Sequence, residues 1–214
     1  YTYWHTLSLH DALPIYSTHF SILEFVFFNE GCDAENICKE FYISSSSLYR
    51  IIRHINKIIK KQYRFEISLN PVRITGNEID IRYFFAQYFS EKYYFLEWPF
   101  TDFSVEPLCK LLALVYKETA FPVNFATQRM LKLLLVTNLY RIKFCHFMEV
   151  ERDSFNNQLL ESFMQAEEIE DIVASFDSEY HISLNKEVLG QLFVSYVEPC
   201  FHSSAFNHSF CRIC

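Results

Sequence analysis

Residues 45–61 place the strongest constraint on the fold, because two patterns share one helical period. Apolar residues recur at spacings of three and four, which predicts an amphipathic helix with one buried stripe. The stripe consists of Leu48, Ile51, Ile52, Ile55, Ile58 and Ile59. The opposite face is polar or basic and consists of Ser45, Ser46, Tyr49, Arg50, Arg53 and Lys57. The rest of the domain must therefore cover one face of this helix and leave the other exposed.

The larger stretch 34–53 has the pattern of a helix-turn-helix, in which a short helix packs across a longer one. The apolar positions that this packing requires are Ile37, Phe41, Ile43, Leu48 and Ile51. Ser44 can cap the second helix, because its hydroxyl can accept a hydrogen bond from a free N–H one turn on. Tyr42 stands where such turns often hold glycine, and a left-handed tyrosine costs roughly 1 kcal/mol. This cost favours a turn that is looser or one residue longer.

Basic residues are concentrated on the second helix and just after it. Residues 50–64 contain six Lys or Arg and no acid, although the whole chain has a formal net charge of -7. Residues 16–82 hold nine basic and eight acidic residues, whereas residues 83–214 hold ten and seventeen. A DNA duplex presents a dense row of phosphates, so the basic stretch predicts DNA contact. The alternative is a solvated basic face on an ordinary surface helix.

After residue 61 the apolar period changes from 3.6 to 2, which predicts two short strands. The first covers residues 63–69, Asn70-Pro71 forms a turn, and the second covers residues 72–75 and ends at Gly76. A hairpin that directly follows a recognition helix is a wing, from which Arg64 and Arg73 can reach the DNA backbone. A small capping hairpin without a DNA role is the alternative.

The predicted DNA-binding residues have different roles. Arg50 and Arg53 can each form a forked pair of hydrogen bonds with a guanine edge. Ser45 and Ser46, at the helix N-terminus, suit a phosphate oxygen. The full predicted set is Ser45, Ser46, Tyr49, Arg50, Arg53, Lys57, Arg64 and Arg73.

The remaining segments predict a mainly α fold, with a winged helix-turn-helix followed by an all-α bundle. A break at Trp98-Pro99-Phe100 places the domain boundary there, which gives a DNA-binding domain over 16–98 and a helical domain over 99–202. Helices are predicted over 16–29, 77–95, 105–119, 125–147 and 185–198, with one or two shorter helices between 155 and 176. Residues 5–15 resemble the translation of a sequencing adapter, so 1–15 are expected to be non-native, and 203–214 form a ragged tail.

Several classes of protein do not fit this composition. Three glycines leave no Gly-rich phosphate loop, and no run of about 18 uncharged apolar residues predicts a membrane span. No catalytic constellation or cofactor motif is found, so an enzyme is not expected. Cys211 and Cys214 form a C-x-x-C pair, but a metal site needs four spaced ligands on an ordered scaffold. A cytoplasmic protein with reduced thiols and no metal is the simplest interpretation.

Short segments along the chain support a family resemblance. They are Ile43-Ser44-x-Ser46-x-Leu48-x-Arg50, Thr75-Gly76-x-Glu78-x-x-Ile81-Arg82, Trp98-Pro99-Phe100, Asn138-Leu139-Tyr140-Arg141-Ile142-Lys143 and Leu192-Phe193-Val194-Ser195-Tyr196. In their order and spacing, over roughly residues 18–202, they resemble the Mga family of bacterial transcription regulators. The resemblance implies a winged helix-turn-helix that binds promoter DNA, followed by a helical domain similar to the PTS regulation domain.

The resemblance also implies regulation by the sugar phosphotransferase system (PTS), whose phosphocarrier proteins phosphorylate such domains on histidine. His146 lies near the position where some members carry that histidine. The alternative is a partly buried core residue beside Phe144, Phe147 and Met148, and His181 is a weaker candidate expected in a loop. Family members are longer, with domains on both sides of this region, and form homodimers largely through their distal portion.

Three functions follow from these patterns. The leading hypothesis is a sequence-specific DNA-binding transcription regulator tied to sugar signalling through its helical domain. The alternative is a protein-interaction or phosphoacceptor module without direct DNA contact, suggested by the larger acidic half. RNA binding is a third possibility, but RNA readers usually offer stacking aromatics on a sheet, which a winged pattern lacks.

Overall fold

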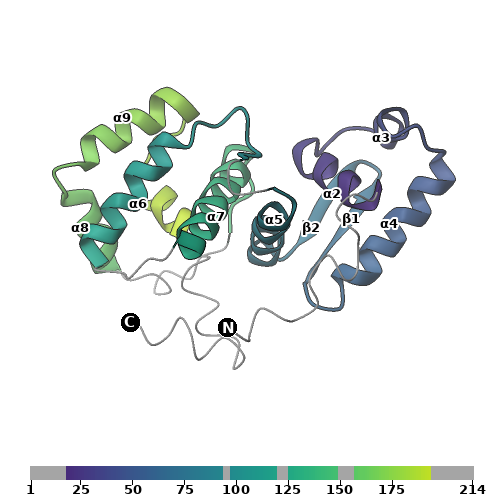
Figure 1. Ribbon diagram of the computed structural model, residues 1–214, viewed down its shortest axis with the longest axis horizontal. Coiled ribbons are helices and arrows are strands. Elements are labelled where there is room, and N and C mark those ends of the chain that lie inside the picture. The colour runs from purple at the N-terminus through teal and green to yellow at the C-terminus, as the bar shows by residue number, and fades with distance from the viewer. Residues whose placement is uncertain (1–17, 94–96, 120–124, 149–156, 194–214) are drawn as a thin grey trace. The chain divides into compact units, whose positions relative to one another are not determined.

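The computed structural model consists of two compact units that meet in the chain between Phe84 and Phe85. Each unit is described separately below. The structure describes residues 18–93, 97–119, 125–148 and 157–193 (Figure 1). The expected non-native segment 1–15, the tail 203–214 and the C-x-x-C pair lie outside the described residues.

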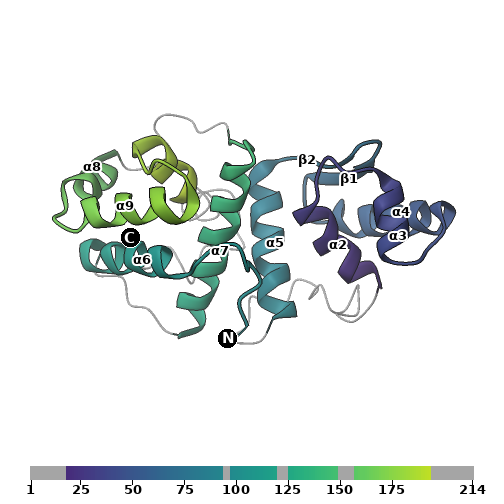
Figure 2. The ribbon, with the colours of Figure 1, turned by 90° about the horizontal axis from the view of Figure 1, so that it is seen from above.

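The first unit is a helix-turn-helix followed by an antiparallel hairpin (Figures 1 and 2). Its elements are α2 (Thr18–Phe28), α3 (Ala34–Glu40), α4 (Ser45–Ile59), β1 (Phe65–Leu69), β2 (Val72–Gly76) and the start of α5 (Glu78–Lys92). Ile67 lies opposite Ile74 in the hairpin, and Leu69 opposite Val72. The predicted winged helix-turn-helix is thereby confirmed.

The apolar stripe of α4 forms the centre of this unit's core. Four of its residues are buried and two, at the edges of the stripe, are half-buried. The buried residues are Leu48, Ile52, Ile55 and Ile59, and the half-buried ones are Ile51 and Ile58. The stripe packs against α2, α3 and β1. Because burying one such side chain stabilises a fold by about 1.5–3 kcal/mol, the stripe fixes which way α4 faces.

Both outer edges of the hairpin are hydrogen-bonded to other elements. On β1, Asn56 of α4 donates through Nδ2 to the Ile67 carbonyl (2.8 Å) and accepts through Oδ1 from the Ile67 N–H (2.9 Å). On β2, the Glu30 carboxylate accepts from the Ile74 N–H (2.9 Å). Gly31 donates to the Val72 carbonyl at 2.7 Å. A two-stranded hairpin is marginal alone, so these bonds hold the wing in place.

The second unit is helical throughout its described part. It contains the end of α5, α6 (Glu106–Thr119), α7 (Phe125–Lys143), α8 (Asn157–Gln165), α9 (Ile169–Tyr180) and a helical segment over residues 186–193. Helix α6 packs against α7, α8 and α9 (Figure 2). The predicted all-α bundle is confirmed. No described helix combines enough length with enough apolar character to cross a lipid bilayer.

Three helices end at a residue other than glycine in the left-handed conformation. These residues are Tyr42 (φ 52°), Cys145 (φ 62°) and His181 (φ 57°). The expected looser turn at Tyr42 is wrong, since a Schellman pattern closes α3 tightly, with Ile43 N–H bonded to the Cys38 carbonyl at 3.0 Å. The same pattern ends α7 at Lys143, earlier than the predicted residue 147.

Removing the Asn56 side chain tests the attachment of the wing. We expect Asn56→Ala to lower the free energy of opening at the Ile67 amide by about 1–3 kcal/mol, because two part-buried backbone groups lose their partner. Native-state hydrogen exchange of that amide measures the change. Asn36→Ala, an exposed asparagine on α3, serves as the control and should leave the exchange rate unchanged.

Substituting His181 tests the left-handed helix ends. We expect His181→Gly to raise the free energy of unfolding of the second unit by about 1 kcal/mol, because glycine adopts this conformation without a Cβ clash. Urea denaturation measures the change. Ser183→Gly, at an exposed position without positive φ, should lower stability instead, since glycine increases the entropy of the unfolded chain.

Candidate nucleic-acid interface

The polar face of α4 is exposed along its whole length. Figure 1 shows α4 at the side of the first unit, with α2 and the strands on its inner side. All the residues that the sequence predicts for this face are exposed, namely Ser45, Ser46, Tyr49, Arg50, Arg53 and Lys57. The helical period therefore separates the buried stripe from the outward face as predicted.

Four cations on α4 and just beyond it form a stripe along one side. Arg50, Arg53, Lys57 and Lys61 are spaced by three or four residues and extend over about 16 Å. Within the described parts of the chain none of the four forms an ion pair, and Arg50 makes a long hydrogen bond to Ser47 Oγ (3.5 Å). These four residues are here called the cation stripe. Their positive charges lie on one face of the helix.

Two other cations of the basic stretch are paired with acids from later elements. Lys60 forms an ion pair with Glu66 of β1. The Arg64 guanidinium binds the Asp80 carboxylate through Nε at 3.0 Å and Nη2 at 3.2 Å. The Arg64 N–H also donates to Asp80, at 2.7 Å. The structure thus gives Arg64 a role in joining the hairpin to α5, and its contact with DNA stays a prediction.

The N-terminus of α4 has the predicted cap. Ser44 Oγ accepts from the Ser47 N–H at 3.2 Å and lies 3.0 Å from Ser46 Oγ. Ser45 and Ser46 are exposed in the first turn, where helix geometry leaves the N–H groups without helical partners. The positive end of the helix dipole lies here, which favours an anion such as a phosphate.

Tyr49 connects the outward face of α4 to the wing. Its hydroxyl accepts a hydrogen bond from Asn70 Nδ2 at 3.1 Å, while the residue remains 46% exposed. On β2, Arg73 lies between the buried residues Val72 and Ile74, so its side chain points to the outer side of the hairpin. Arg73 is exposed and has no ion-pair partner among the described residues. The wing therefore carries one further unpaired cation.

A pair of histidines from two helices lies beside this surface. The rings of His54 on α4 and His19 on α2 meet edge to face, with centroids 5.6 Å apart. Burial, and then the charge of His54, lower the pKa of His19 below its usual value. The lowered pKa favours the neutral form of His19.

His146 in the second unit lies in a segment whose backbone is fixed. The residue is half-buried, and its N–H donates to the Arg141 carbonyl at 3.0 Å. The side chain of Gln191 binds both backbone groups of Met148, at 2.9 and 2.8 Å. Phe144 and Phe147 on either side are 55% and 53% exposed, whereas Met148 is buried. His181, the weaker candidate, is exposed at the end of α9.

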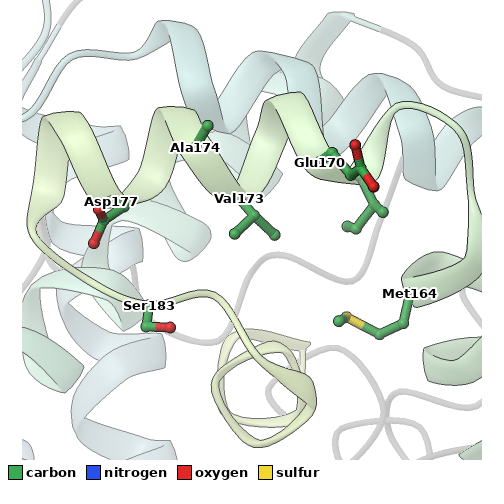
Figure 3. A pocket seen from close by; sticks show the side chains of 7 residues that line it. Met164, Glu170, Val173, Ala174, Asp177 and Ser183 are labelled. Atoms are coloured by element: carbon green, nitrogen blue, oxygen red, sulfur yellow. The ribbon is translucent and has the colours of Figure 1, made fainter.

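A groove of about 620 Å³ lies between α9 and the segments before and after it (Figure 3). Its lining residues are Met164, Ile169, Glu170, Val173, Ala174, Asp177 and Ser183. Glu170 and Asp177 lie at its two ends along α9, with Val173 and Ala174 between them (Figure 3). Carboxylates at these positions repel phosphate, so the groove does not suit nucleic acid.

No group of three or more His, Cys, Asp or Glu residues in the described part of the chain could hold a metal ion.

Residues 5–89 match the model of the Mga helix-turn-helix domain. Residues 104–210 match the model of the M protein trans-acting positive regulator (MGA) PRD domain. The chain belongs to the Mga family. The predicted boundary near Trp98 falls between the two matched ranges and stays a prediction.

Relatives of this Mga-family chain include regulators from two organisms. A putative trans-acting regulator of Streptococcus pneumoniae serotype 4 is 74% identical over 186 residues, which is 87% of this chain and 38% of that protein. The capsule synthesis positive regulator AcpA of Bacillus anthracis is 25% identical over 52% of this chain and 23% of its own length. AcpB of the same organism is 22% identical over 58% and 26%. The chain therefore spans less than two fifths of these relatives.

Proposed function

We propose that this chain is the DNA-binding and adjoining regulatory part of a sequence-specific transcription regulator. The observation that carries the proposal is the cation stripe, because it lies on the face of α4 opposite the buried core and is unpaired within the described residues. The Mga helix-turn-helix match and the regulators among the relatives support it. The proposed division is residues 16–98 for DNA binding and 99–202 for regulation.

In this proposal α4 enters the major groove, which is wide enough for one helix. Arg50 and Arg53, near the middle of α4, read guanine edges through forked hydrogen bonds. Lys57 and Lys61 follow the phosphates, and Ser45 and Ser46 bind a phosphate at the helix N-terminus. Tyr49 lies between the base-reading residues and the wing, and Arg73 contacts the backbone from the wing. Phosphate contacts fix the register, and base contacts supply the specificity.

Binding to a duplex selected from a randomised pool tests this assignment. We expect Arg50→Ala and Arg53→Ala each to weaken binding by about 1–3 kcal/mol at the selected site and to relax its sequence preference. Lys57→Ala should weaken binding to all sequences alike. It should also reduce the magnitude of the slope of log K against log salt by about 0.9. Fluorescence anisotropy at several salt concentrations measures both effects.

Lys110→Ala is the matched control, because Lys110 is an exposed lysine on α6 that lies outside the proposed interface. It should change neither the affinity nor the salt slope. Binding that does not depend on salt, or that survives the loss of both arginines, would contradict a DNA role for α4. The alternative, a protein-interaction or phosphoacceptor module without DNA contact, would then be favoured.

For the regulatory domain we infer a phosphoacceptor role for His146, with a PTS phosphocarrier protein as the donor. The phosphoryl group would leave a histidine of the carrier and form a bond with an imidazole nitrogen of His146. Hydrogen bonds fix the backbone at His146 and Met148, and the exposed Phe144 and Phe147 offer apolar surface to a partner. Homodimers are proposed only for the full-length protein.

Transfer of labelled phosphate tests this role. We expect incorporation from phosphoenolpyruvate through the general PTS proteins to be lost in His146→Ala and retained in His181→Ala, the matched control at another helix end. Acid-labile label measured after gel separation reports phosphohistidine. Label that persists in His146→Ala would place the modification at another residue.

A further inference from the structure

Tyr42 lies in the turn of the helix-turn-helix, where neither its side chain nor its backbone conformation stabilises the fold. It is 96% exposed, and its φ of 52° lies in the left-handed region that favours glycine. Its side chain has no hydrogen bond or ring contact with any described residue, and only its backbone N–H is bonded, to the Lys39 carbonyl at 3.4 Å. A large apolar ring in water on a strained backbone is doubly unfavourable.

The position of Tyr42 relates it to the proposed DNA surface. Tyr42 precedes the cap residue Ser44 by two residues, so its Cα lies within about 8 Å of that of Ser44. The hydrogen bonds that close α3, including Ile43 N–H to the Cys38 carbonyl at 3.0 Å, fix the backbone at this point. Tyr42 is therefore an exposed residue close to the N-terminal end of α4, where the first-turn serines lie.

We propose that Tyr42 contacts the sugar–phosphate backbone at the edge of the major groove that α4 enters. Its hydroxyl donates a hydrogen bond to a phosphate oxygen, and its ring covers the adjoining deoxyribose. Tyrosine is among the side chains that bind DNA phosphates in this way. The inference rests on the proposed function and adds a neutral contact beside the cation stripe and the first-turn serines.

A neutral contact has a signature that distinguishes it from the cation stripe. Only cationic side chains displace condensed counterions when they bind phosphates, so the salt slope counts charges. Loss of Tyr42 should therefore lower affinity by the same factor at every salt concentration. It should also leave base preference unchanged, because backbone contacts carry no direct sequence information.

The experiment compares Tyr42→Gly, Tyr42→Asn and Tyr42→Phe in the full chain. The DNA is the duplex selected from the randomised pool, which also serves to test Arg50 and Arg53. We expect Tyr42→Gly to bind about tenfold more weakly with an unchanged salt slope, while its urea midpoint rises. Tyr42→Asn, which also tolerates the left-handed conformation, should show the same loss of affinity without added backbone freedom. Tyr42→Phe should lose only the part that depends on the hydroxyl.

His181→Gly is the matched control, since it relieves the same conformation at a helix end outside α4. It should raise the urea midpoint without changing DNA affinity. Unchanged DNA affinity in Tyr42→Gly and Tyr42→Asn would overturn the inference. If these variants bind DNA normally but lose transcription, Tyr42 contacts a protein partner instead. If the variants of Arg50 and Arg53 also bind normally, the proposed function itself is wrong.

Discussion

Burial of the apolar stripe of α4 determines the direction of every charged group on that helix. Once Leu48, Ile52, Ile55 and Ile59 pack against α2, α3 and β1, the helical period leaves Arg50, Arg53 and Lys57 no other side than the exposed one. Rotation of α4 to pair these cations elsewhere would expose four large apolar side chains. Packing of the hydrophobic core thus keeps these like-charged side chains on one face, although they repel one another.

The first unit contains both ion-paired and unpaired cations. Lys60 and Arg64 lie on either side of Lys61 in the sequence, yet the fold brings Glu66 and Asp80 to them, and Arg64 is held by three hydrogen bonds to one carboxylate. These pairs join consecutive elements near the end of α4. Within the described residues, unpaired positive charge therefore continues along one side of α4 from Arg50 to Lys57 and on to Lys61.

Much of the architecture was predictable because it follows from local periods. The stripe of α4, the alternation in β1 and the cap at Ser44 all depend on residues a few positions apart. No local pattern predicts the roles of Asn56 and Glu30, because they bind strand residues that are 11 and 44 positions away. Asp80 was missed for the same reason. The end of α7 at Lys143 was missed because apolar residues continue up to residue 147, past the point where Cys145 takes a positive φ.

Asn56 and Tyr49 tie the wing to α4 at two points, one at the strand edge and one at the hairpin turn. These hydrogen bonds fix the distance between α4 and the wing. In the proposed complex they also fix the distance between the groove contact of α4 and the backbone contact of Arg73. DNA advances about 3.4 Å for each base pair. An operator bound in the proposed way therefore has a fixed internal spacing, and one inserted base pair between the two contacts would leave one of them unmade.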